Sequence, residues 1–262
     1  MTLFDAATAL GLPSAPGAIL PLAVLAAFLA GVVDAIGGGG GLVTLPVLLE
    51  AGIPMHAILG TNKGQAVVGA TSSLYTFARR GLIDRARVLP SLAGSFVGSL
   101  FGAFVACRTD PSRLRGVVLA LLLAAAAIMV APMPKARARA AFGAGRTLAL
   151  TTAIGFYDGF FGPGTGTLLV AGFVAFEGDD LVRASAHAKV ANWASNVAAM
   201  LVFSSRGVIL WPLALPMAVA NALGARLGAT LAVTRGAALI RPVVFTVALL
   251  LTAKTAWQLV SG

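Results

Sequence analysis

Two short motifs in this 262-residue chain each place a lysine among amide and hydroxyl side chains. The polar residues in them are Thr61, Asn62, Lys63 and Gln65 in "GTNKGQ", and His187, Lys189, Asn192 and Asn196 in "HAKVANWASN". A lysine supplies positive charge and its neighbours supply directional hydrogen-bond donors, a combination that suits a small oxyanion. On a helix that begins near Lys189, Asn192 and Asn196 share one face. We predict that both motifs contact an anionic substrate. The alternative is that the lysine side chains extend to the membrane–water interface and that the amides hold helices together.

Two glycine-rich stretches interrupt apolar sequence. They contain Gly38, Gly39 and Gly40 in "AIGGGGGLVTLP", and Gly162, Gly164 and Thr165 in "GFYDGFFGPGTGT". Because glycine in a helix costs about 1 kcal/mol relative to alanine, the clusters predict breaks in membrane-spanning segments. A break exposes backbone N–H groups at the start of the next half-helix, where the helix dipole also favours an anion. The alternative is that small residues let helices pack closely.

An aspartate precedes each glycine cluster, Asp34 in the first and Asp158 in the second. An ionisable group at membrane depth is energetically costly and is a functional hypothesis by default. These residues could carry a coupling proton, because burial favours the neutral form of a carboxyl group. They could instead pair with a basic residue or cap the exposed N–H groups of the glycine turn. The sequence slightly favours pairing or capping and leaves the choice open.

The composition is that of an integral membrane protein. Hydrophobic residues make up 58% and charged residues 11% of the chain, with a mean hydropathy of +0.93, whereas about 25% of residues are charged in soluble domains. We predict an all-α polytopic protein with about eight long spans of roughly 20 residues and two short half-helices. The long runs are Ile19 to Ile36, Gly64 to Ala78, Val88 to Cys107, Gly116 to Ala131, Leu148 to Phe161, Val190 to Phe203, Ile209 to Val233 and Pro242 to Val260. The short runs are Leu42 to Ala51 and Thr167 to Phe176.

Several functional classes find no support in these residues. The net charge of +10 comes from basic residues in short links, where they indicate cytoplasmic loops and not a nucleic-acid site. One cysteine and two histidines leave no disulfide and no cysteine-rich metal site, so no cofactor is expected. No nucleophile and base are paired by any motif, so no catalytic residue and no enzyme activity is predicted. The charged stretch "EGDDLVR", from Glu177 to Arg183, is predicted as a solvated link.

The two halves of the chain are similar to each other. Asp158 follows Asp34 by 124 positions, and Lys189 follows Lys63 by 126. We predict two repeats, residues 17–131 and 147–260, joined by a basic cytoplasmic link at 132–146. An odd number of crossings per repeat would invert the second repeat relative to the first, whereas re-entrant short segments with four crossings would leave them parallel. Inversion is favoured because Arg206 stands almost alone where the first half has four arginines.

The motifs resemble a known family. "GFYDGFFGPGTGT" followed by "ASAHAKVANWASNVAAMLVF", with "GGGGGLVTLP" and "GTNKGQAVVGATSS" in the first half, closely resemble the sulfite exporter TauE/SafE family of membrane proteins. The likeness extends from about Leu22 to Val260. It implies a bacterial-type multi-pass carrier associated with sulfite, small sulfonates or other sulfur-containing anions. The second glycine cluster differs from the first in carrying Pro163, Thr165 and Thr167, so the two halves need not contribute equally to a site.

Together these patterns favour a secondary transporter of small anions with its site near the membrane midplane, between the repeats. No nucleotide-binding P-loop is present in the sequence, so ATP is not expected to drive transport directly. An anion channel is the alternative, and single-channel currents would distinguish it. The expected partners are the lipid bilayer of a bacterial inner membrane, a small inorganic or organic anion, coupling protons and a second copy of the chain, but no nucleic acid.

Overall fold

The computed structural model describes residues 16–130 and 143–235, and within these ranges all regular structure is helical. The helices are α2 (Pro16–Gly37), α3 (Gly41–Glu50), α4 (Met55–Arg79), α5 (Arg85–Arg108), α6 (Pro111–Val130), α7 (Ala144–Phe160), α8 (Thr165–Glu177), α9 (Leu181–Ser205) and α10 (Trp211–Arg235). Among them, Ile19–Gly37, Arg85–Arg108 and Trp211–Arg235 are long and apolar enough to cross a membrane. The predicted span from Pro242 to Val260 lies outside the described residues.

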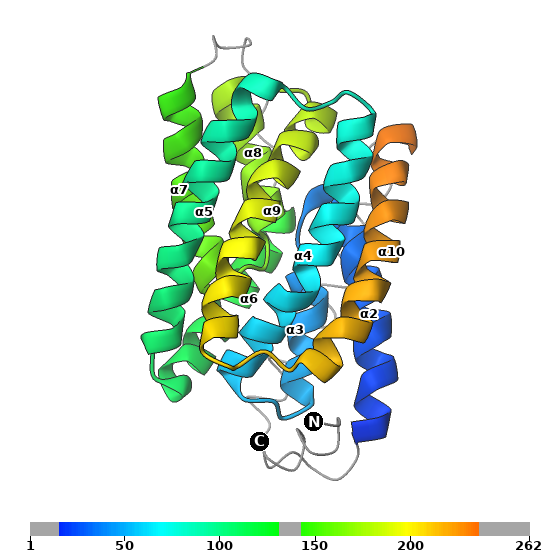
Figure 1. Cartoon of the computed structure of the whole chain (residues 1–262), viewed down its shortest axis with the longest axis vertical. Coiled ribbons are helices and arrows are strands. Elements are labelled where there is room, and N and C mark those ends of the chain that lie inside the picture. Colours follow the sequence, from blue (N-terminus) through cyan, green and yellow to red (C-terminus); the bar gives the residue numbers. More distant parts are fainter. Residues whose placement is uncertain (1–15, 131–142, 236–262) are drawn as a thin grey trace.

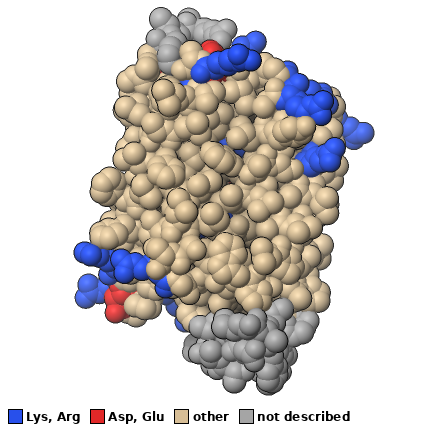
Figure 2. Space-filling model, in the orientation of Figure 1, with Lys and Arg blue, Asp and Glu red and all other residues tan. Residues whose placement is uncertain are grey.

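The long helices run along one axis and define two ends of the molecule (Figure 1). At the end called here the Arg85 end, α4 and α8 finish and α5, α7 and α9 begin. At the opposite end, called the Trp211 end, α3, α5 and α9 finish and α4 and α10 begin. Lysine and arginine side chains gather towards the two ends, and a broad, nearly uncharged belt separates them (Figure 2). Such a belt fits the hydrocarbon layer of a bilayer, which is about 30 Å thick.

Two helix pairs pack with their backbones in close contact, α5 on α7 and α10 on α2. A Cβ atom added at Gly98 or Gly102 of α5 would overlap the backbone of α7, and one added at Gly224 or Gly228 of α10 would overlap that of α2. The close-packing role of small residues therefore applies to these glycines. In both pairs, the glycine with the higher residue number contacts a residue with a higher number in the partner helix. The two helices of each pair therefore run parallel.

The predicted helix breaks are confirmed at both glycine clusters. The chain between α2 and α3 has φ angles of +77° at Gly38 and +113° at Gly39. Between α7 and α8, the φ angles are +100° at Gly162 and +83° at Gly164. Side chains other than glycine rarely adopt these angles, so glycine allows the chain to reverse within the membrane region. Each break therefore turns a long helix back as a short one, α3 or α8.

The two breaks meet at the centre of the helix bundle. A Cβ atom at Gly38 would overlap the backbone of Gly166, and the reverse also holds, so these two segments touch directly. The Thr167 hydroxyl also donates a hydrogen bond of 2.7 Å to the Gly37 carbonyl oxygen. The short helices α3 and α8 thus begin next to each other and run towards opposite ends of the molecule (Figure 1).

The helices that carry the two polar motifs begin earlier than the hydropathy pattern predicts. We expected a helix that starts near Lys189, but α9 begins at Leu181, with the Asp180 side chain accepting hydrogen bonds from the Val182 and Arg183 N–H groups. Likewise α4 begins at Met55. The prediction was wrong because the polar residues of these helices are buried against other helices and not against lipid. Such residues lower the hydropathy of the segment, so a prediction from hydropathy alone places the start of the helix after them.

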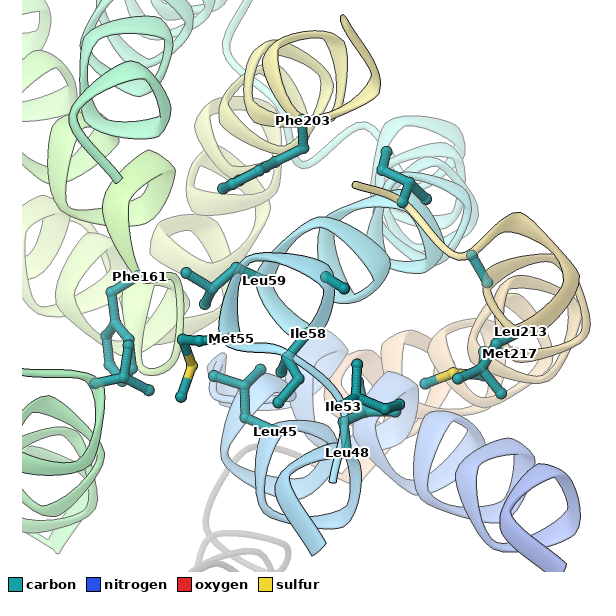
Figure 3. Packing of buried hydrophobic residues seen from close by; sticks show 14 of the residues in the cluster. Leu45, Leu48, Ile53, Met55, Ile58, Leu59, Phe161, Phe203, Leu213 and Met217 are labelled. Atoms are coloured by element: carbon teal, nitrogen blue, oxygen red, sulfur yellow. The ribbon is translucent and has the colours of Figure 1, made fainter. Parts of the chain in front are cut away.

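Buried apolar side chains close the core near the Trp211 end. Leu45 and Leu48 of α3, Ile58 of α4, Phe203 of α9 and Leu213 of α10 gather around the start of α4 (Figure 3). In a bilayer, such contacts act through van der Waals packing, because lipid tails are as apolar as the side chains themselves. The Trp211 end is therefore held mainly by apolar packing.

Candidate functional site

Two buried ion pairs cross between the two halves of the chain. Lys63 Nζ on α4 lies 2.7 Å from Asp158 Oδ1 on α7. Lys189 Nζ on α9 lies 2.8 Å from Asp34 Oδ2 on α2. Each lysine thus meets the aspartate in front of the glycine break of the other half. Of the roles that the sequence left open for the aspartates, pairing with a basic residue is the one that these distances confirm.

The pair Lys63–Asp158, called here the sealed pair, is held by three further hydrogen bonds. Asp158 Oδ1 also accepts a hydrogen bond of 2.8 Å from the Thr165 hydroxyl, and Oδ2 accepts one from the Ser195 hydroxyl. Lys63 also donates to Asn196 Oδ1 at 3.2 Å. Both charged side chains are almost fully buried, with 3% and 2% of their surface exposed. A buried charge is tolerated in this way only when it is paired and hydrogen-bonded.

The pair Lys189–Asp34, called here the open pair, is less enclosed. Lys189 donates both to the carboxylate and to the backbone carbonyl oxygen of Asp34. The lysine side chain is 2% exposed, but 26% of the Asp34 side chain remains exposed. Asp34 also lines a small cavity between the helices. Solvent or a solute in the cavity can therefore reach this carboxylate.

A small cavity lies where the two pairs and the two glycine breaks meet. Its lining comprises Asp34, Gly40, Gly41, Asn62, Lys63, Gln65, Ala66, Asp158, Gly162, Asn192, Asn196 and Asn221. The space open to the centre of a water molecule is about 30 Å³, and one water needs about 10–15 Å³ on this scale, so the cavity has room for about two waters. Its lining is polar and its size suits small solutes.

Hydrogen bonds orient the amides on the α4 side of the cavity. The Thr44 hydroxyl on α3 donates to Asn62 Oδ1 at 2.7 Å. Gln65 Nε2 donates to the same oxygen at 3.1 Å. On the α9 side, Asn196 Nδ2 donates to the Asn192 backbone carbonyl oxygen at 2.7 Å. The amides of Asn62, Gln65 and Asn196 are thus held in place beside the cavity.

Most of the residues predicted for the site come together. The cavity lining includes the predicted residues Asp34, Gly40, Asn62, Lys63, Gln65, Asp158, Gly162, Asn192 and Asn196. Thr165 and Lys189 lie one step behind it, because each contacts an aspartate. Gly38, Gly39 and Gly164 form the turns of the two breaks.

Thr61 and His187 do not line the cavity. The Thr61 hydroxyl oxygen accepts a hydrogen bond of 3.1 Å from the Leu210 N–H, towards the Trp211 end. His187 lies towards the Arg85 end, with Nδ1 at 2.7 Å from Asp179 Oδ2 and Nε2 at 3.0 Å from the Asp84 backbone nitrogen. Both residues therefore connect helices on either side of the cavity.

Sequence reasoning missed Asn221 of α10, which lines the cavity. Its Nδ2 donates to the Ala27 carbonyl oxygen at 3.0 Å, and its Oδ1 occupies the space where a Cβ atom of Gly69 would be. The signal that could have found it is a single amide within an otherwise apolar helix, since polar groups at membrane depth usually face the bundle interior.

The predicted solvated link "EGDDLVR" is wrong for its first residues. Glu177 and Asp179 are buried, with 0% and 2% of their surface exposed. They are buried because Arg87, itself only 2% exposed, lies 2.8 Å from Asp179 and 3.6 Å from Glu177. Within residues 16–130 and 143–235, no group of three or more acidic, histidine or cysteine side chains is arranged to hold a metal ion.

Comparisons with known proteins give a family match and several similar proteins. A family profile described as sulfite exporter TauE/SafE matches residues 23–255. The chain is 38% identical to the "Probable membrane transporter protein ORF9" of Sinorhizobium sp, over 89% of this chain and 90% of that protein. It is 37% identical to the "Probable membrane transporter protein YfcA" of Escherichia coli strain K12, over 90% of this chain and 89% of that protein. A "Probable membrane transporter protein" of Haemophilus influenzae is 36% identical over 92% of this chain and 95% of its own. No solved structure matches the chain.

Proposed function

Because the chain belongs to the sulfite exporter TauE/SafE family of membrane transporters, we propose that it is a secondary carrier of small anions. The proposed substrates are sulfite, sulfonates or related sulfur oxyanions, carried across a bacterial inner membrane. The observation that carries this proposal is the pair of crossed lysine–aspartate contacts around a small polar cavity. Lysines among amides favour an oxyanion, and the cavity admits only a small one.

Inverted repeats are the proposed framework of the carrier. The helices at corresponding positions, α2 and α7, α4 and α9, and α5 and α10, run in opposite directions (Figure 1). Close contacts also recur at the offsets of the sequence repeat. Gly98 meets Thr152 and Gly102 meets Phe156, while Gly224 meets Phe28 and Gly228 meets Val32. These features support two inverted repeats that enclose a midplane site, the arrangement that many secondary transporters use for alternating access.

The glycine breaks support the choice of an anion over a cation. The short helices α3 and α8 both begin next to the cavity, at Gly41 and Thr165. The N-terminus of a helix carries a partial positive charge of roughly half an elementary charge. Two such ends and two lysines give the site a positive potential that the aspartates balance.

The charge balance of the site links the anion to a proton. Two lysines and two ionised aspartates have no net charge, so an anion must compete with a carboxylate for a lysine ammonium group. When one aspartate takes up a proton, its lysine becomes available to the anion. In this scheme the anion and the proton bind together, which couples transport to a proton gradient without ATP.

Binding and flux measurements test the proposed function. Purified protein is heated with thiosulfate, sulfite, sulfate or sulfoacetate, with simple carboxylates for comparison. A sulfur oxyanion at about a hundred times its Kd is expected to stabilise the protein by about 2.7 kcal/mol and to raise its Tm. Uptake into proteoliposomes should then saturate and should show no single-channel current. Single-channel currents would identify a channel, and no shift with any of these anions would contradict the proposed substrate class.

A further inference from the structure

A matching hydrogen bond connects helices on each side of the cavity. At the Trp211 end, the Thr61 hydroxyl oxygen accepts from the Leu210 backbone N–H at 3.1 Å. At the Arg85 end, His187 Nε2 accepts from the Asp84 backbone N–H at 3.0 Å. His187 lies 126 positions after Thr61, and Leu210 lies 126 positions after Asp84, which is the same offset that separates Lys189 from Lys63. In each case the acceptor lies two residues before the lysine of an ion pair, and the donor lies in the turn that precedes α10 or α5.

The surroundings of His187 select one protonation state. Its Nδ1 lies 2.7 Å from Asp179 Oδ2, so Nδ1 carries the proton and donates it to the carboxylate. Its Nε2 must then be unprotonated, because it faces the Asp84 N–H group. The ring also lies against Phe173, with centroids 5.7 Å apart. The neutral imidazole therefore satisfies both contacts, one as donor and one as acceptor.

The charged groups around His187 come from α5, α7, the end of α8 and the two adjoining turns. Arg87 at the start of α5 lies 2.8 Å from Asp179, 3.6 Å from Glu177 and 3.9 Å from Asp84. Arg146 of α7 lies 3.4 Å from Glu177, which also accepts a hydrogen bond from the Thr147 hydroxyl. These contacts connect the ends of α5, α7 and α8 to the α8–α9 turn. Beside the Arg87–Asp84 contact, His187 provides a hydrogen bond from α9 to the α4–α5 turn.

A proton added to His187 breaks one specific contact. It would occupy Nε2, where it would point at the Asp84 N–H group, so two donors would face each other and the hydrogen bond would be lost. The contact between Nδ1 and Asp179 would remain. A hydroxyl group cannot be protonated in this way at neutral pH, so the Thr61 contact at the Trp211 end does not change. That end is held by apolar packing around Ile58 and Leu213 as well (Figure 3).

We propose that His187 is a proton-sensitive gate residue: in its neutral form it holds the Arg85 end closed, and its protonation releases the α4–α5 turn from α9. Thr61 occupies the corresponding place in a gate that does not respond to protons. The gating role of His187 rests on the proposed carrier function, whereas the proton-sensitive contact itself does not. The group recognised is a proton delivered from the Arg85 side, since histidine is the side chain that ordinarily changes charge between about pH 5 and pH 8.

Amide hydrogen exchange on the full chain in lipid nanodiscs tests the contact directly. The protection of the Asp84 and Leu210 amides, corrected for the intrinsic effect of pH, is compared between about pH 8 and about pH 5. We expect the protection of Asp84 to fall by about tenfold, the effect of losing one hydrogen bond. Leu210, whose acceptor is a hydroxyl oxygen, is the comparison within the same molecule and should keep its protection.

Two variants separate the gate from a general effect of pH. His187→Gln retains an acceptor that does not titrate, so the Asp84 amide should lose its pH response. His56→Gln is the matched control, because His56 Nε2 bonds to the Ala106 carbonyl oxygen at the Trp211 end and is not part of the network. This variant should keep the wild-type pH response. If His187→Gln fails to fold, the comparison of Asp84 with Leu210 in the wild-type protein still decides the question.

Equal pH responses of the Asp84 and Leu210 amides would overturn the proposal, as would a response that persists in folded His187→Gln. Neither measurement needs a bound anion. A failure of the anion screen together with a positive exchange result would therefore refute the substrate and leave the proton-sensitive contact standing. The opposite combination would refute the gate and leave the carrier proposal standing.

Discussion

The two ion pairs of the central cavity use the same residue types in different surroundings. In the sealed pair, Lys63–Asp158, both carboxylate oxygens have partners and almost no surface is exposed. In the open pair, Lys189–Asp34, about a quarter of the aspartate side chain remains exposed. Sequence similarity between the two halves therefore does not make the two pairs equivalent.

The residues around the pairs explain the difference. The hydroxyl groups that enclose Asp158 belong to Thr165 and Ser195, whereas the residues at the corresponding offsets in the first half are Gly41 and Gly69. A glycine provides no hydroxyl, and the space beside Gly69 is taken by the amide of Asn221. Both carboxylates line the cavity, but Asp158 is almost fully buried with a partner on each oxygen and suits a fixed counter-ion. The more exposed Asp34 can exchange its partner. We assign the first role to Asp158 and the second to Asp34.

The largest expected effect is on folding. Asp158→Asn should destabilise the protein by about 3–5 kcal/mol, because it leaves the Lys63 ammonium group buried without a counter-charge. Asp34→Asn should cost less, about 1–3 kcal/mol, because its partner can gain water from the cavity. Unfolding in mixed detergent micelles measures both. Equal losses of stability in the two variants would remove the distinction between a sealed and an open pair.

The next effect is on binding. Lys189→Ala should weaken the binding of a sulfur oxyanion by about 10- to 100-fold, the range for a charged hydrogen bond of about 1.5–3 kcal/mol. Calorimetric titration of folded protein measures this change. Lys63→Ala is the comparison, and here we expect the loss of stability to dominate because Asp158 would remain buried and unpaired. Undiminished affinity in folded Lys189→Ala would exclude this lysine from the site.

A smaller effect should follow when the seal itself is weakened. Ser195→Ala removes the hydroxyl that donates to Asp158 Oδ2, and the expected loss of stability is about 1–3 kcal/mol. The variant should also make Asp158 behave more like Asp34, so that a second group responds to pH in transport assays. A Ser195→Ala protein with unchanged stability and pH profile would show that the hydroxyl does not seal the pair.

The smallest effect belongs to a control glycine. Gly116→Ala in α6 adds a Cβ atom that meets nothing within 4 Å, so it should leave anion binding unchanged and stabilise the helix by about 0.5–1 kcal/mol. Gly98→Ala is unsuitable as such a control, because its Cβ atom would overlap the Thr152 carbonyl group.

Valine at Gly40 or Gly164, in the two helix breaks, should abolish the protection of the protein by the anion. Protection that survives in these folded valine variants would exclude the breaks from the site.

Local sequence patterns were sufficient for some features and not for others. The breaks at Gly38 and Gly162 could be predicted because helix propensity and backbone freedom are properties of single residues. The aspartate partners could not, because the crossed pairing depends on which helices pack together. The same holds for Glu177, whose burial depends on Arg87 from a distant helix. A charged residue in a short link is usually solvated. It can be buried only when a partner of opposite charge from another helix lies beside it, and the local sequence does not identify that partner.

The central claim is that a proton on Asp34 releases Lys189 to the anion, and proton uptake on binding tests it most directly. Thiosulfate is titrated into the purified protein by calorimetry in two buffers with different heats of ionisation; this anion stays ionised near neutral pH, so any proton taken up goes to the protein. We predict uptake of about one proton per bound anion in the wild type and none in Asp34→Asn. Binding of thiosulfate with no proton uptake in the wild type, or with unchanged uptake in Asp34→Asn, would contradict the account.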